Sequence, residues 1–157
     1  MGFVLIVFLA WLMLMLFTSM NKNLTFIENT FVYLVALVIN INFTWIVYEE
    51  LNMAKISQQI LDNSAFLIHR SITLPLTVAI TLNLFRTAPS FGSKIFKTIL
   101  SVLFLVLAVV IALYFDIVDY RKWNIGYEII YLFLLHLVVQ SLLKYFGQLK
   151  TKGVNEA

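Results

Sequence analysis

The residues best suited to chemistry in this chain are polar side chains that lie inside long apolar segments. The clearest are His69 and Arg70, in one such segment, and His136, near the middle of another. An ionisable group at the centre of a bilayer costs about 2.5–3.5 kcal/mol on insertion scales, so such groups usually have a partner or a function. These three residues are therefore the first candidates for a functional site.

Arg70 allows two interpretations. It lies six residues past Ser64, where its helix is predicted to begin, and therefore about 9 Å along that helix. From this depth the guanidinium can reach back to the outer interface and anchor the helix there. In the other interpretation, Arg70 pairs with a carboxylate on the same side, namely Glu128, Asp116 or Glu49. The interfacial anchor is the favoured interpretation.

His136 lies eleven residues into its predicted helix, about 16 Å from the helix start. Asn40 and Thr77 are expected at a similar depth, so the three side chains are predicted to form one hydrogen-bonded layer. Such contacts between membrane helices stabilise the bundle by about 0.6 kcal/mol each. The alternative is a proton or solute relay through His136, Glu128 and Gln140, which spread over about 120° of the helix. A lone His favours the structural interpretation.

The acidic residues offer oxygen ligands for a cation without the spacing of a known metal site. Asp116 and Asp119 are three residues apart, and Glu49 is followed by Glu50. Hard cations prefer oxygen ligands, but neither pair belongs to a loop with a calcium-site signature. Solvated loop charge is the favoured interpretation, and we predict neither a metal site nor a cofactor.

The sequence contains none of the common catalytic motifs. HExxH, GxSxG, the P-loop and GxGxxG are all missing from the chain. An intramembrane enzyme built on Glu49, Glu50 and His136 is the least favoured alternative, because these residues are expected to differ in depth by about half the membrane. We therefore expect no enzymatic activity and no catalytic residue.

The composition is that of an integral membrane protein. Of 157 residues, 62% are hydrophobic and only 12% are charged, against about 25% charged in soluble domains. Cys is missing, which excludes disulfides and thiolate metal sites. The formal net charge of +3 comes from basic residues that flank apolar segments, so no nucleic-acid partner is expected.

Hydropathy predicts an all-α bundle of five transmembrane helices. The clearest segment, 98–115, has eighteen residues without charge, Pro or Gly and covers about 27 Å as a helix, close to the thickness of a bilayer core. Residues 1–146 are expected to form a single domain. The five predicted helices cover about 3–20, 30–48, 64–85, 97–115 and 125–146.

Several smaller expectations complete this fold. Residues 51–63 are either a short amphipathic helix in the interface plane or a plain loop. Pro75 falls inside the third helix, where neighbouring Thr side chains are expected to satisfy the freed backbone groups. Residues 147–157 are expected to form a short, frayed cytoplasmic tail. The second, third and fifth helices should supply the polar interior, and the first should be peripheral and mostly lipid-facing.

Basic residues indicate the orientation of the bundle. Four of the Lys and Arg residues fall on the side of the N-terminus, including Arg70. The positive-inside rule places the richer side, and the C-terminus with it, in the cytoplasm, and the N-terminus outside. This orientation requires the third helix to cross the membrane completely. The seven basic residues on the richer side are Lys22, Arg86, Lys94, Lys97, Lys144, Lys150 and Lys152.

For function, the sequence favours a small membrane protein without enzymatic activity, an accessory or assembly partner of a larger membrane system. Its expected partners are the lipid bilayer and another membrane protein or a second copy of the chain. The expected location is a membrane, most simply the plasma membrane. The alternative is a small transporter or channel-like protein with a polar pathway between the second, third and fifth helices.

Overall fold

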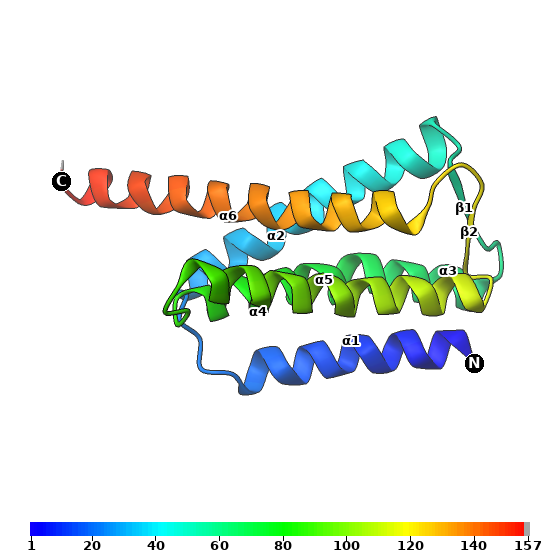
Figure 1. Cartoon of the computed structure of the whole chain (residues 1–157), viewed down its shortest axis with the longest axis horizontal. Helices are drawn as coiled ribbons and strands as arrows, with labels where there is room; N and C mark the ends of the chain where they lie inside the picture. Colours follow the sequence, from blue (N-terminus) through cyan, green and yellow to red (C-terminus); the bar gives the residue numbers. More distant parts are fainter. Residues whose placement is uncertain (156–157) are drawn as a thin grey trace.

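Five long helical stretches run side by side and form one bundle (Figure 1). The structure, a computed structural model, describes residues 1–155. Within them, five stretches are long and apolar enough to cross a membrane, which confirms the predicted number and order of helices. They are Gly2–Ser19, Phe26–Glu50, Ile60–Phe85, Phe91–Tyr114 and Ile125–Leu149.

These stretches are built from six α-helices and two short π-helical segments in the described residues. The π-helical segment η1 (Ile46–Glu50) continues the second stretch, and η2 (His69–Thr73) lies in the middle of the third. The α-helices are α1 (Gly2–Ser19), α2 (Phe26–Trp45), α3 (Ile60–Ile68), α4 (Leu74–Phe85), α5 (Phe91–Tyr114) and α6 (Ile125–Asn155).

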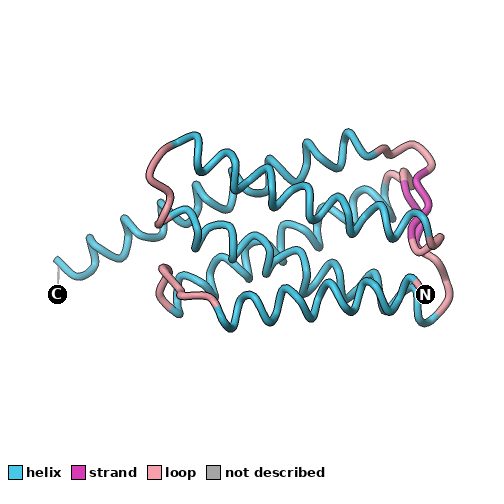
Figure 2. Tube along the Cα trace, turned by 60° about the horizontal axis from the view of Figure 1, so that its bottom comes forward, coloured by secondary structure: helices cyan, strands magenta, loops and turns pink. Residues whose placement is uncertain are grey.

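The two ends of the bundle differ. At one end, β1 (Ala54–Ile56) pairs antiparallel with β2 (Val118–Tyr120), close to the N-terminus (Figure 2). We call this the strand end. The opposite end holds the connections around Lys22 and Arg86, and we call it the basic end. α6 runs past it, so the described termini lie at opposite ends (Figure 1).

Residues 51–63 contain β1 and the beginning of α3, and the interfacial helix considered for this segment is not formed. Backbone groups of residues 51–63 instead form hydrogen bonds with the connection after α5. The carbonyl of Met53 accepts the N–H groups of Arg121 and Lys122, each at 2.9 Å, and the N–H of Ser57 donates to the carbonyl of Ile117 at 3.0 Å. Pairing between the two connections therefore replaces the internal hydrogen bonds of a helix.

The third stretch, α3–η2–α4, is the centre of the bundle. In its apolar 18-residue window 67% of the residues are buried, against 33% or fewer in the other four stretches. α2 and α5 pack against α4, and α1 packs against α3 at the periphery. Fully buried apolar side chains fill the middle of the bundle, among them Val32, Val78, Leu105 and Leu135.

Several helix ends differ from the predicted ones for local reasons. α2 begins at Phe26 because Thr25 and Glu28 form a capping box: each side chain bonds the other's backbone N–H. Ser64, where the third helix was predicted to begin, lies inside α3, and its hydroxyl donates to the carbonyl of Ile60 at 2.8 Å. α6 continues to Asn155, so most of the predicted tail is helical, and residues 156–157 lie outside the described residues.

Candidate functional site

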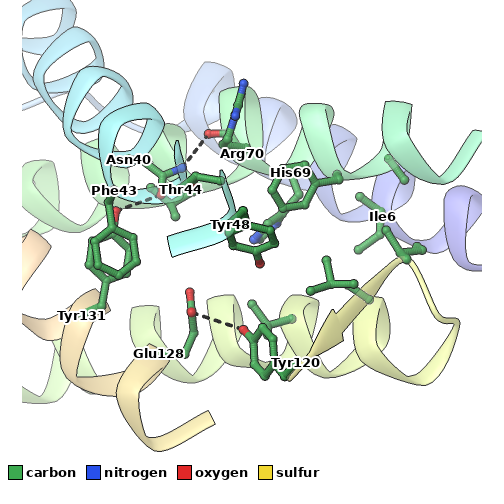
Figure 3. A pocket seen from close by; sticks show the side chains of 17 residues that line it. Ile6, Asn40, Phe43, Thr44, Tyr48, His69, Arg70, Tyr120, Glu128 and Tyr131 are labelled. Carbon is green, nitrogen blue, oxygen red and sulfur yellow. Dashed lines mark hydrogen bonds between the residues drawn. The ribbon is translucent and has the colours of Figure 1, made fainter. Parts of the chain in front are cut away.

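A small hollow lies inside the bundle near the strand end (Figure 3). Its volume is about 40 Å³, which is room for about three water molecules. All five helical stretches and β2 contribute residues to its walls. The polar residues that line this strand-end hollow are Asn40, Thr44, Tyr48, His69, Arg70, Tyr120, Glu128 and Tyr131.

Glu128 supplies the carboxylate of the strand-end hollow. It lies in the first turn of α6 and is partly buried. Its Oε2 accepts a hydrogen bond from the hydroxyl of Tyr120 at 3.2 Å (Figure 3). It also accepts one from the indole Nε1–H of Trp123 at 2.9 Å. Burial, and then the charge of Glu128, raise the pKa of Tyr120 well above its usual range. Tyr120 therefore remains a neutral donor to Glu128.

A second chain of hydrogen bonds crosses the inner wall of the hollow. The hydroxyl of Tyr131 donates to Oδ1 of Asn40 at 2.8 Å, and the Asn40 amide donates to the backbone carbonyl of Arg70 at 3.1 Å. The ring of Tyr131 also stacks on Phe43, with the ring centroids 3.5 Å apart. α6, α2 and η2 are thereby joined at one point beside the hollow.

The π-helical segment η2 has a cause in the sequence. The N–H of Leu74 bonds the carbonyl of His69, five residues back, and the next residue, Pro75, has no N–H to donate. Neither Leu74 nor Pro75 therefore supplies a donor to the carbonyls of Arg70 and Ser71.

Two side chains of α2 supply the missing donors. The amide of Asn40 bonds the carbonyl of Arg70, and the hydroxyl of Tyr33 bonds the carbonyl of Ser71 at 2.7 Å. The expectation that Thr side chains do this is wrong for these two carbonyls. Thr77 instead donates to the carbonyl of Thr73, at 2.6 Å, on its own helix.

η2 also holds the buried polar atoms that have no protein partner. Among the residues whose side chains the structure describes, there are three such atoms: Nδ1 of His69, Nε of Arg70 and Oγ1 of Thr73. Figure 3 shows the guanidinium of Arg70 pointing away from the hollow, and its carbon Cζ lies 5.8 Å from the centre of the Phe66 ring. His69 lines the hollow beside Tyr48.

The ion pair considered as the alternative for Arg70 is not formed in the described part of the chain. The two ion pairs there join Arg86 to Glu28 and Arg121 to Asp119. Glu49 and Asp116 are exposed at the strand end, where Asp116 adopts a φ of +55° in the turn that follows α5. Of the three carboxylates considered for Arg70, Glu128 alone lines the same hollow, and it faces Tyr120 and Trp123.

The predicted layer of Asn40, Thr77 and His136 is not formed either. His136 is buried in the middle of α6, where its Nδ1 lies 2.8 Å from the Leu132 carbonyl and its Nε2 lies 2.9 Å from the Ser101 hydroxyl. Because a carbonyl only accepts, Nδ1 carries the proton and Nε2 accepts from Ser101. The third residue of the proposed relay, Gln140, lies farther along α6 and lines a groove with Arg86 and Lys144.

The basic end holds a buried amide network that the sequence analysis missed. Oδ1 of Asn83 accepts the N–H groups of Asn23 and Leu24, each at 3.0 Å, and its Nδ2 donates to Oδ1 of Asn29 at 2.6 Å. The network fixes the connection between α1 and α2 to the end of α4. The spacing of these Asn residues gives no periodic signal, so only the Thr25-x-x-Glu28 capping box beside them was detectable in the sequence.

As a chemical site, the strand-end hollow offers hydrogen-bond acceptors, hydroxyls and aromatic rings. The described residues contain no group of three or more His, Cys, Asp or Glu side chains placed to hold a metal ion.

Comparison of the chain with protein-family models, curated proteins and solved structures found no match.

Proposed function

We propose that this chain is a multi-pass membrane protein that works, without enzymatic activity, as an accessory or assembly partner of a larger membrane system. In this proposal the five stretches cross the plasma membrane, with the N-terminus outside and the C-terminus in the cytoplasm. Support for the orientation comes from Arg86, Lys94 and Lys144, which line one groove at the basic end.

The observation that carries the proposal is the closed interior of the bundle. Fully buried apolar side chains, including Val78, Leu105 and Leu135, pack together between the strand-end hollow and the amide network at the basic end. The polar groups at the same level, His136 and Ser101, bond each other. A bundle that uses its interior for packing leaves its outer helix faces for interaction with other molecules.

Site-specific photo-crosslinking in native membranes tests this proposal. A photoreactive amino acid at exposed positions of different helices, such as Leu14, Val38, Leu103 and Leu137, should give a protein adduct of one defined mass on one helix face. Leu105, which is fully buried, is the control and should give none. Lipid adducts alone at every exposed position would contradict an assembly role.

A transporter or channel-like protein is the second candidate, and the strand-end hollow favours it. This candidate requires water to reach beyond the hollow to His136. The chain has no native Cys, so a His136→Cys variant carries a single thiol. Reaction of this thiol with water-soluble reagents from either side supports a transport pathway, and protection from both sides supports the closed bundle.

A further inference from the structure

We propose that the strand-end hollow is a binding site for a small monovalent cation of the ammonium class, held between the carboxylate of Glu128 and the imidazole of His69. Figure 3 shows both side chains at this hollow, from opposite walls. The site does not depend on the assembly role proposed above, because it is argued from the interior of the bundle alone.

No cationic side chain in the described residues balances the charge of Glu128 through an ion pair. The two hydrogen-bond donors to Glu128, Trp123 and Tyr120, are both neutral. Neither of the two ion pairs in the described residues involves Glu128. A partly buried carboxylate without a cationic partner is costly, and a bound cation removes that cost.

The hydrogen-bonding capacity of the hollow also fits an ammonium ion. Nδ1 of His69 is buried and has no partner in the protein, and a neutral imidazole accepts a hydrogen bond at one ring nitrogen. Glu128, when ionised, accepts only. A ligand that carries both positive charge and several N–H donors matches these groups. An ammonium ion has this combination, whereas Na⁺ has no hydrogen to donate to the ring nitrogen.

The size of the hollow and the nature of its walls suit a small cation. Aromatic rings of Phe43, Tyr48 and Tyr131 line the hollow, and ring faces attract cations. A volume of about 40 Å³ is room for about three water-sized groups. Ammonium or methylammonium fits this space, and tetramethylammonium, with five heavy atoms and no N–H, does not.

The backbone around the hollow is also unusual. Both π-helical segments contribute to this one hollow: Tyr48 comes from η1, and His69 comes from η2. π-Helical turns are rare, and they occur frequently at functional sites. Their convergence on the same small space supports a site there.

Fluorescence of the full-length protein in detergent provides the test. Trp11→Phe and Trp45→Phe leave Trp123, which bonds Glu128, as the single indole. We expect methylammonium chloride, at constant ionic strength, to give a saturable shift in Trp123 emission. NaCl and tetramethylammonium chloride should not give one. A response of equal size to NaCl, or no saturable response to methylammonium, overturns the proposal.

A matched pair of variants locates the site. Glu128→Gln keeps the shape and removes the charge, and should weaken the apparent methylammonium affinity at least tenfold. Glu49→Gln removes an exposed carboxylate at the same end and should leave the affinity unchanged. An unchanged affinity in Glu128→Gln overturns the proposal. Calorimetric titration of the unchanged chain with the same three salts gives the same decision if Glu128→Gln does not fold.

Discussion

The hydroxyl of Tyr33 donates a hydrogen bond of 2.7 Å to the backbone carbonyl of Ser71. This carbonyl lies four residues before Pro75, which has no N–H with which to bond it. A side chain of α2 thus replaces a backbone donor missing from the third stretch. Together with the bond from Asn40 to the Arg70 carbonyl, it ties α2 to the most buried stretch of the bundle beside the strand-end hollow.

Tyr33→Phe tests this replacement. The variant leaves the Ser71 carbonyl without its donor and should destabilise the bundle by about 1 kcal/mol. In a Pro75→Ala background the new N–H can bond that carbonyl, so the same substitution should then cost much less. The midpoint of thermal unfolding in detergent measures both costs. Equal costs in the two backgrounds would show that the hydroxyl does not compensate for the proline.

Asn83→Ala should be the most damaging single change at the basic end. It leaves the buried N–H of Leu24, the partly buried N–H of Asn23 and the Oδ1 of Asn29 without their partner. Each unsatisfied buried group costs about 1–3 kcal/mol, so a loss of several kcal/mol is expected in the same unfolding measurement. The control is Asn42→Ala, because Asn42 is exposed and bonds only Val38 of its own helix. A similar loss in both variants would contradict a network specific to Asn83.

Ser101→Ala should have a mild effect. It removes the donor to Nε2 of His136 but leaves the bond between Nδ1 and the Leu132 carbonyl in place. Single hydrogen bonds between membrane helices average about 0.6 kcal/mol and reach about 1.7 kcal/mol, and the loss of stability should fall in that range. A double-mutant cycle with His136→Phe isolates the pair. A coupling energy of zero would mean that the two side chains do not interact.

The stability of the folded protein is expected to fall at high pH because of Tyr120. Its pKa is raised in the folded protein, first by burial and then by the charge of Glu128. The unfolded chain therefore loses this proton at a lower pH than the folded chain, and stability should fall as pH rises above about 10, the ordinary pKa of Tyr. In Tyr120→Phe this fall should be shallower. Identical alkaline unfolding profiles for the two proteins would remove Tyr120 as a cause.

The number and order of the helices were predictable because each long apolar run in the sequence directly indicates one helix. Helix ends were less predictable, because they depend on single contacts. Because of the capping box of Thr25 and Glu28, α2 begins at Phe26, nearer the N-terminus than the predicted start at about residue 30. The T-x-x-E pattern of this box was present in the sequence. The pairing of β1 with β2 was not predictable, since three-residue strands carry no pattern and the central pair, Lys55 and Asp119, is 64 residues apart in the sequence.

The sequence identified several residues of the candidate site, but it did not predict which side chains bond each other there. His69, Arg70, Asn40 and Glu128 were singled out as polar groups in apolar segments, and the structure brings all four to one hollow. Tyr48, Tyr120 and Tyr131 were missed as site residues, because an aromatic residue near a helix end is usual in membrane proteins. The depth of His136 suggested a bond to Asn40, but helix rotation turns it toward Ser101 of α5.

The central claim, that the chain crosses the membrane five times, is tested most directly by labelling single cysteines. The protein contains no native Cys, so Asp119→Cys at the strand end and Asn21→Cys at the basic end, both at exposed positions, each carry one thiol. In intact cells a membrane-impermeant maleimide should label position 119 and not position 21, and both should react once the membrane is opened. Equal labelling of the two positions in intact cells, or labelling of position 21 alone, would contradict the account.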